Sequence, residues 1–218
     1  MMLAVCAILG YLLGCIPTGV AISRFYARTD IRKTGSGNTG TTNVLRTLGW
    51  LPSILTLVGD ALKGVAAALI GRWLGGETGM LLGSLFAVLG HDFPVFTRFK
   101  GGKGIATSLG VTIVISPPVA PCLVLIVVLV VALTRMMSLG SLIASISYPL
   151  LFWAFMPADG NRLYRMCFAV VLMLLSFFCH RANIARLFRG EENKLNFDLI
   201  GKLSGFHFRR FKDRIKKQ

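Results

Sequence analysis

The segment 35–46 combines residue types that hold phosphate groups in proteins. It reads Gly-Ser-Gly-Asn-Thr-Gly-Thr-Thr-Asn-Val-Leu-Arg. Glycine lets backbone N–H groups turn toward a ligand, hydroxyls add donors, and a guanidinium forms paired hydrogen bonds with phosphate oxygens. The alternative is a flexible polar loop whose glycines only form turns. The candidate ligand-binding residues of this segment are Gly35, Ser36, Gly37, Asn38, Asn43 and Arg46.

A second polar segment, 90–104, ends in Lys-Gly-Gly-Lys-Gly directly before an apolar run. A glycine loop that leads into a helix presents unpaired N–H groups and the positive end of the helix dipole to an anion. The spacing differs from that of the nucleotide-binding P-loop. The alternative is a basic turn that touches lipid headgroups. The candidates here are Lys100, Gly101, Gly102, Lys103 and Gly104.

A third polar segment, 180–192, follows the last long apolar run. If the segment is helical, His180, Asn183 and Arg186 share one face. Alone, it would be interpreted as an ordinary cationic helix end. Together with the other two segments, it predicts a site for an anionic ligand that meets lipid.

Four polar residues within apolar runs are weaker candidates. Asp60 and Lys63 are separated by one helical turn, as are Ser138 and Ser141. Charges in hydrocarbon are costly, so Asp60 and Lys63 should face the protein interior, where they either pair with each other or reach the site. The serines either donate to substrate or tie helices together.

The composition shows which elements must position these residues. The chain of 218 residues is 54% hydrophobic and 15% charged, against about 45–50% and about 25% in globular proteins. This balance excludes a soluble enzyme, a nucleic-acid module and a disordered chain. It predicts an all-α, polytopic integral membrane helix bundle of about seven transmembrane helices, the fourth being short. The predicted spans are 1–23, 51–71, 78–97, 104–116, 118–134, 137–156 and 163–180.

The distribution of basic residues predicts the orientation. With the N-terminus outside and the C-terminus cytoplasmic, the inner segments hold twenty Lys and Arg residues and the outer segments three. All three polar segments then lie on the cytoplasmic face. The net charge of +15 is accounted for by anionic headgroups of the lipid bilayer, with no nucleic-acid partner. We expect a membrane domain over 1–192 and a basic cytoplasmic tail over 193–218, either an interfacial helix or disordered.

The three polar segments resemble the three signature motifs of the bacterial acyl-phosphate:glycerol-3-phosphate acyltransferase family, PlsY. The resemblance covers roughly residues 5–192, in motif order. It implies transfer of an acyl group from acyl phosphate to the 1-hydroxyl of glycerol 3-phosphate, giving lysophosphatidic acid and inorganic phosphate. It further implies an active site on the cytoplasmic face of the bacterial inner membrane and a functional link to an enzyme that forms acyl phosphate.

The resemblance also implies roles for individual residues. Ser36, Arg46 and His180 would form the catalytic centre, the loop with Lys103 would hold glycerol phosphate, and Asn183 would complete the pocket. No histidine has the aspartate partner that soluble-domain glycerolipid acyltransferases use. The proton acceptor is therefore either His180 or a substrate phosphate, and a covalent acyl-Ser36 intermediate is a third possibility.

Two other functions compete with this one. A transporter of an organic phosphate would hold its ligand near the bilayer midplane, between internal repeats, and the sequence shows no repeat. A transferase acting on a polyprenyl phosphate would need paired carboxylates for magnesium, and the motif regions contain only Asp92 and the pair Glu191 and Glu192. We therefore expect neither a metal nor a cofactor.

Overall fold

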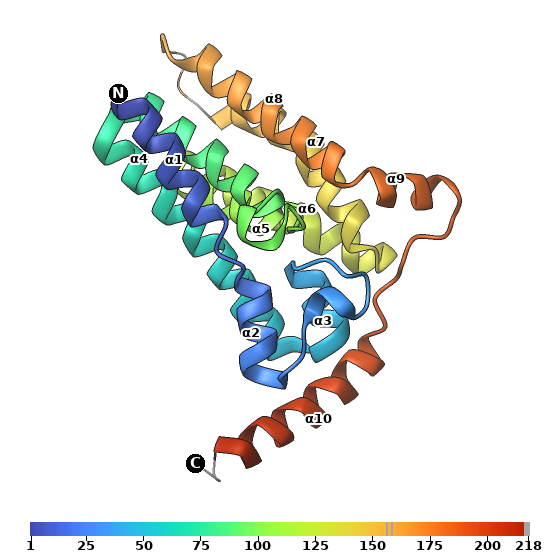
Figure 1. Ribbon diagram of the computed structural model, residues 1–218. Coiled ribbons are helices and arrows are strands. Elements are labelled where there is room, and N and C mark those ends of the chain that lie inside the picture. The colour runs from blue at the N-terminus through green and yellow to red at the C-terminus, as the bar shows by residue number, and fades with distance from the viewer. Residues whose placement is uncertain (156, 158, 216–218) are drawn as a thin grey trace.

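The structure is a computed structural model that describes residues 1–155, 157 and 159–215. Within these residues the regular elements are all helical, which confirms the predicted all-α class (Figure 1). Two short 3-10 helices cover Ile31–Lys33 and Val95–Thr97. The α-helices are α1 (Met2–Gly14), α2 (Thr18–Ala27), α3 (Thr41–Leu48), α4 (Trp50–Asp92), α5 (Ile105–Ile115), α6 (Val119–Thr134), α7 (Met137–Phe155), α8 (Arg162–Cys179), α9 (Arg181–Phe188) and α10 (Phe197–Ile215).

Four helical segments of the described chain are long and apolar enough to cross a membrane. They are Met2–Ala27, Trp50–Thr97, Met137–Phe155 and Arg162–Cys179. The apolar helices α5 and α6 are shorter, with 11 and 16 residues, or about 16 Å and 24 Å of helix against a hydrocarbon core of about 30 Å. α7 begins where the predicted sixth span begins, and residue 156 lies outside the described part of the chain; α8 begins and ends one residue before the predicted seventh span, 163–180.

The long helix α4 is two helices joined by a sharp reversal, as the sequence predicts. Gly75 and Gly76 leave the helical region, and Gly76 has a φ of +60° that favours glycine. A Cβ atom on Gly71 would overlap the carbonyl oxygen of Gly79, so the two halves run back along each other. This reversal separates the predicted second span from the third.

The first predicted span, 1–23, is interrupted instead of forming the single helix expected from its apolar run. α1 ends at Gly14 and α2 begins at Thr18. Pro17 has no N–H group to donate and disfavours helical geometry at Ile16. The Lys63 ammonium donates to the Ile16 carbonyl at 3.0 Å, so a charged side chain of α4 satisfies a backbone acceptor that the break leaves without a helical partner.

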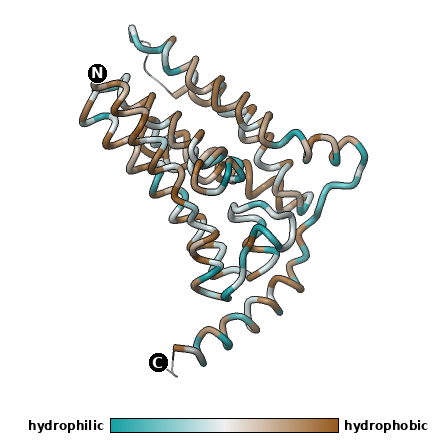
Figure 2. The backbone as a smooth tube through the Cα atoms, viewed as in Figure 1, coloured by the Kyte–Doolittle hydropathy of each residue, from teal (hydrophilic) through white to brown (hydrophobic). Residues whose placement is uncertain are grey.

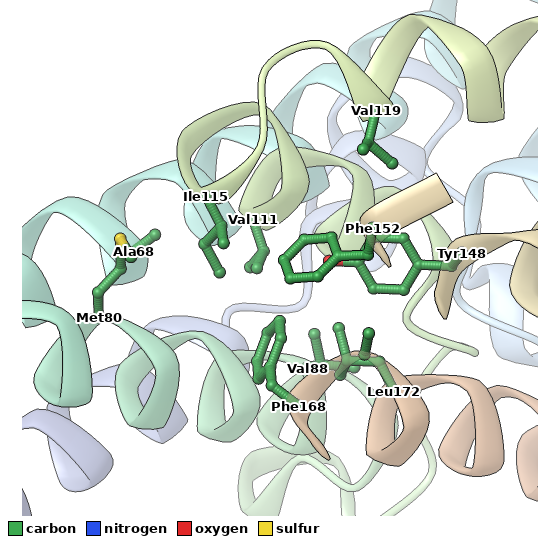
Figure 3. Packing of buried hydrophobic residues seen from close by; sticks show 11 residues of the cluster. Ala68, Met80, Val88, Val111, Ile115, Val119, Tyr148, Phe152, Phe168 and Leu172 are labelled. Atoms are coloured by element: carbon green, nitrogen blue, oxygen red, sulfur yellow. The ribbon is translucent and has the colours of Figure 1, made fainter. Parts of the chain in front are cut away.

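The helices approach closely because small residues line their contacts. A Cβ atom on Gly10 would meet the backbone of Gly83, and one on Gly110 would meet the carbonyl oxygen of Ala61. Such contacts replace hydrophobic burial as the force that joins helices in lipid. Larger side chains from α4, α5, α7 and α8 pack together in one buried hydrophobic cluster (Figure 3), namely Val88, Val111, Ile115, Tyr148, Phe152, Phe168 and Leu172.

Replacing Gly110 by Val is expected to destabilise the protein by about 2 kcal/mol or more, because the added side chain must push α5 away from α4. Gly201→Val is the matched control, since a Cβ atom on Gly201 meets nothing within 4 Å. Thermal unfolding in detergent measures both. An unfolding midpoint of Gly110→Val equal to that of the control would show that this helix contact tolerates separation.

Hydrophilic stretches gather around α3, after α9 and along α10, whereas α1, α4, α6, α7 and α8 are mainly hydrophobic (Figure 2). The tail expected to be an interfacial helix or disordered contains the helix α10, and residues 216–218 lie outside the described part. The polar stretches from distant parts of the sequence thus reach one end of the bundle.

Candidate functional site

Asn43, on α3, fixes the shape of the first polar segment. Its side chain is buried, and its Nδ2 lies within 3.1 Å of the carbonyl oxygens of Ile31, Thr34 and Asn38. Its Oδ1 accepts the N–H of Ser36 at 2.9 Å. A buried amide with both ends satisfied rigidifies its surroundings. Asn43, a candidate ligand-binding residue, therefore organises the loop from within.

The loop that Asn43 holds contains two glycines with left-handed backbone. Gly35 and Gly37 have φ values of +58° and +73°, which glycine adopts without steric cost. Asn38 Oδ1 accepts the Gly40 N–H at 2.8 Å, and Asn38 Nδ2 donates to the Gly101 carbonyl at 3.4 Å. The first polar segment is thereby joined to the second. Ser36 is exposed at the surface of this loop.

The second segment packs its glycines against His91. The Gly102 N–H donates to the His91 carbonyl at 3.0 Å, so this amide, expected to face a ligand, is used within the protein. Cβ atoms on Gly101 and Gly102 would meet the carbonyl oxygen and the imidazole of His91. Gly104 precedes α5 with a φ of +68°. Lys100 is exposed, whereas the Lys103 side chain reaches α9, where it contacts Asn183.

Lys103 meets the third segment in a cluster of polar and charged side chains. Its ammonium donates to Asn183 Oδ1, and Asn183 Nδ2 donates to Glu192 Oε1 at 2.8 Å. Ser138, at the start of α7, donates to the same oxygen at 2.9 Å. Arg186 Nε donates to Glu192 Oε2 at 2.9 Å. Side chains of α7 and α9 therefore converge on one carboxylate, and Lys103 is linked to it through Asn183.

Arg46, on the last turn of α3, belongs to the same cluster. Its Nη2 donates to the Asn193 carbonyl at 2.9 Å, and its Nε is buried without an acceptor among the residues that the structure describes. Burial lowers the pKa of Arg46, Glu192 opposes this effect and Arg186 adds to it. We call Arg46, Lys103, Ser138, His180, Asn183, Arg186 and Glu192 the basic cluster.

Burial and charge set the protonation states in the basic cluster. Burial lowers the pKa of Lys103 to about 8, with Glu192 opposing and Arg186 and Arg46 adding to the shift. Burial and the nearby Lys103 lower the pKa of His180 to about 4. The Glu192 carboxyl is buried, which favours its neutral form, but hydrogen bonds from Asn183 and Ser138 together with Arg186 hold its pKa below the usual value. Glu192 is therefore charged at neutral pH.

His180 is neutral at pH 7 and has a defined orientation. Its Nδ1 lies 2.8 Å from the Ser176 carbonyl. Since a carbonyl only accepts, Nδ1 carries the proton and Nε2 keeps its lone pair. The side chain is buried at the junction of α8 and α9, with 2% of the residue exposed.

Asp60 and Lys63 form a separate buried group. Their side chains pair at 2.9 Å, and His91 Nδ1 lies 3.4 Å from Asp60 Oδ1. A pocket beside them is lined by residues that include Cys15, Pro17, Thr39, Pro94 and Thr97. The two charges thus pair with each other at the break between α1 and α2. Ser141 donates to the Met137 carbonyl of its own helix at 2.9 Å, unlike Ser138.

Sequence reasoning placed Arg186 on the right face without assigning it to the site, and it missed Glu192. In the sequence Glu192 is one of an acidic pair, yet in the structure it is buried while the Glu191 side chain is 60% exposed. A single carboxylate that closes a basic segment is a signal for an internal counter-ion. Three cations face this one anion, so the basic cluster keeps an excess of positive charge for an anionic ligand.

The fold and the basic cluster together define an all-helical membrane protein, over its described residues, with a candidate anion site at one end of its bundle. The family model described as glycerol-3-phosphate acyltransferase matches residues 4–190. A glycerol-3-phosphate acyltransferase of Thermoanaerobacter pseudethanolicus is 43% identical over 192 residues, which is 87% of this chain and 93% of the relative. That of Nitrobacter winogradskyi is 45% identical over 186 residues, which is 85% and 92% of the two chains.

Two solved structures share the fold of this chain. The crystal structure of PlsY, an integral membrane glycerol 3-phosphate acyltransferase, in its glycerol 3-phosphate form has a TM-score of 0.80 and 38% identity, covering 90% of this chain and 96% of that chain. Its lysophosphatidic acid form has a TM-score of 0.81 and 36% identity, with coverages of 92% and 98%. The chain belongs to the glycerol-3-phosphate acyltransferase family. The predicted family and the acyltransferase activity are confirmed.

Proposed function

We propose that this enzyme transfers an acyl group from acyl phosphate to the 1-hydroxyl of glycerol 3-phosphate. The observation that carries the proposal is the basic cluster, where Arg186 pairs with the single carboxylate of Glu192, Lys103 is linked to it through Asn183, and Arg46 bonds the neighbouring Asn193 carbonyl. A donor and an acceptor that both carry phosphate need such an excess of positive charge to be held side by side. The solved relatives in glycerol 3-phosphate and lysophosphatidic acid forms support the substrate and the product.

In the proposed reaction, the 1-hydroxyl oxygen of glycerol 3-phosphate attacks the acyl carbon of acyl phosphate. The bond between the acyl carbon and the phosphate oxygen breaks, which releases inorganic phosphate and leaves lysophosphatidic acid. Arg46 and Lys103 neutralise the charge that develops on the leaving phosphate. Asn183 orients the Lys103 ammonium through its Oδ1, and Asn38 ties the loop that contains Ser36 to Gly101, two residues before Lys103.

The hydroxyl proton passes to a phosphate oxygen of the substrate in this proposal. A pKa of about 4 makes His180 a weak base at neutral pH, whereas the second pKa of a phosphate monoester is about 6. His180 instead holds the junction of α8 and α9 through its hydrogen bond to the Ser176 carbonyl. Among the described residues, no histidine or carboxylate hydrogen-bonds the Ser36 hydroxyl, so a covalent acyl-Ser36 intermediate has no support from a paired base.

The membrane arrangement is proposed on the same basis. With seven spans, the N-terminus outside and the C-terminus inside, the basic cluster faces the cytoplasm, where glycerol 3-phosphate is available. The predicted excess of inner Lys and Arg residues supports this orientation. The donor, being both anionic and acylated, would come from a phosphate-acylating enzyme at the inner membrane of the bacterial cell and meet the site at the lipid surface.

Release of inorganic phosphate by the full-length protein in detergent tests the proposed function. Palmitoyl phosphate and glycerol 3-phosphate are supplied together, each alone, and with palmitoyl-CoA in place of palmitoyl phosphate. We expect phosphate release and lysophosphatidic acid only when both substrates are present, and no product with palmitoyl-CoA. A folded, monodisperse sample without turnover would contradict the proposal and direct the work to glycerol phosphate uptake in liposomes.

The activity is expected to fall at alkaline pH because Lys103 loses its proton there. With a pKa of about 8 for Lys103, kcat/KM should decline above pH 8 by up to about tenfold per pH unit. Lys103→Arg should keep the positive charge and remove this decline, while Lys100→Arg, on an exposed side chain, should leave the profile unchanged. Rates measured between pH 6 and pH 10 check this, and an identical profile for Lys103→Arg would assign the decline to another group.

A further inference from the structure

The helix α10 lies beyond residue 190, where the match to the family model ends. One face of α10 contacts the rest of the protein. The residues of this face are buried or half-buried and follow the spacing of a helical stripe, namely Ile200, Leu203, Ser204, His207 and Phe211. Ser204 Oγ accepts the Trp50 N–H at 3.0 Å, and Phe211 stacks on Tyr26 with 4.7 Å between ring centroids. α10 is therefore fixed to the ends of α2 and α4.

A second face of α10 is apolar and exposed. Phe197, Phe208 and Ile215 are 40%, 50% and 54% exposed and fall on one flank of the helix at i, i+11 and i+18. The Phe197 ring lies parallel to the Trp50 ring, with 6.3 Å between centroids. Trp50 is itself exposed and begins α4, whose next exposed residue, Leu51, belongs to a membrane span. Exposed apolar surface thus continues from the span onto α10 without a break.

The remaining surface of α10 carries its exposed cations, among which Leu199 and Phe206 are also exposed. Residues 194–217 contain eight Lys and Arg residues against two Asp. Of these, Lys202, Arg209, Arg210 and Lys212 are exposed on α10. A helix with an aromatic flank and a cationic face lies in the plane of an anionic membrane surface, with its rings at the headgroup level. The position of α10 below α2 and α3, at the end of the bundle that carries the basic cluster, suits this placement (Figure 1).

We propose that α10 docks on the anionic bilayer surface through Phe197, Phe208, Ile215 and its exposed Lys and Arg residues. The docking also bears on α3. Leu195 and Ile200 pack with Leu45, and the Asn193 carbonyl accepts from Arg46 at 2.9 Å. A lipid-bound α10 therefore holds α3, and with it Arg46, against the bundle. An acidic partner protein would fit the charge but not the apolar flank that continues from the span.

Amide hydrogen exchange of the full-length protein in nanodiscs tests this proposal, since exchange does not depend on turnover. Discs of phosphatidylcholine are compared with discs that also contain phosphatidylglycerol. We expect exchange over 197–215 to slow by about tenfold or more in the anionic discs, because several basic residues are attracted to such a surface together. High salt should reverse the slowing.

Variants distinguish lipid docking from packing within the protein. Combining Arg209→Glu, Arg210→Glu and Lys212→Glu should abolish the difference between the two discs, whereas Lys33→Glu, at an exposed cation outside α10, should retain it. Equal exchange of the unmodified protein in both discs would overturn the proposal, as would slowing that persists in the triple variant. If exchange slowed only after the enzyme that supplies acyl phosphate was added, α10 would bind a protein and not the lipid surface. This result would also overturn the proposal.

Discussion

Replacing Arg46 by Ala is expected to lower kcat/KM on the order of a hundredfold or more while the fold is retained. The Arg46 guanidinium is half-buried, and its Nε has no acceptor among the residues that the structure describes. A buried donor of this kind is satisfied when a ligand oxygen reaches it. Its removal takes away both a charge and a directed hydrogen bond from the leaving phosphate. Initial rates with palmitoyl phosphate and glycerol 3-phosphate measure the effect.

Two further variants separate the charge of Arg46 from its geometry. Arg46→Lys keeps a positive charge but lacks the planar pair of donors, so an intermediate loss is expected. Arg189→Ala is the control, because the Arg189 side chain is 60% exposed and pairs with Glu191 in the same region. Exposed ion pairs contribute little, so kcat/KM of this variant should change less than about twofold. A rate for Arg46→Ala close to that of Arg189→Ala would remove Arg46 from the reaction.

The convergence of the three polar segments at one site could be predicted from the sequence. The apolar runs fix the order of the spans, and the basic residues place the segments on one side. The contacts between Asn38 and Gly101 and between Lys103 and Asn183 agree with this expectation. The reversal in α4 was also predictable, because two glycines lie between two apolar runs.

The internal use of polar groups could not be predicted from residue types. Asn43 and the Gly102 amide have the chemistry of ligand contacts, yet they hold the loops together. Asp60 and Lys63 pair beside the helix break that Pro17 causes, a position that depends on how α4 packs against the segment between α1 and α2. A donor in a sequence can serve the fold or a ligand, and only its neighbours in space decide which.

The structural role of Glu192 could not be predicted from its residue type either. On residue type it belongs to an acidic pair, and nothing local distinguishes it from Glu191. The distinction arises because the chain after α9 turns back and carries Glu192 between α7 and α9, where Ser138, Asn183 and Arg186 reach it. This contact, 54 residues apart in sequence for Ser138, requires the full arrangement of α7 and α8.

Glu192→Ala is expected to destabilise the protein by about 2–3 kcal/mol, somewhat less than a fully buried ion pair because Arg186 retains some exposure. The change leaves Arg46, Lys103 and Arg186 facing one another without an anion. The unfolding midpoint in detergent should fall by roughly 5–10 °C. Glu191→Ala, on the neighbouring exposed side chain, should shift the midpoint by less than about 2 °C. Equal shifts for the two variants would show that Glu192 is not the counter-ion of the cluster.

Glu192→Gln and pH separate the charge of Glu192 from its hydrogen bonds. The amide oxygen of Gln still accepts from Asn183 and Ser138, so the loss relative to the unmodified protein comes from the charge facing Arg186 and from the hydrogen bond of Glu192 Oε2 with Arg186 Nε; the dependence of this loss on pH isolates the charge. Because the pKa of Glu192 is lowered in the folded protein, its charge contributes stability above the ordinary pKa of about 4.3. That contribution disappears as the pH falls through the folded value. The difference in unfolding midpoint between Glu192→Gln and the unmodified protein should therefore have its full size near pH 7, begin to shrink near pH 4 and disappear only at lower pH, whereas a constant difference would mean that the Gln side chain simply packs less well.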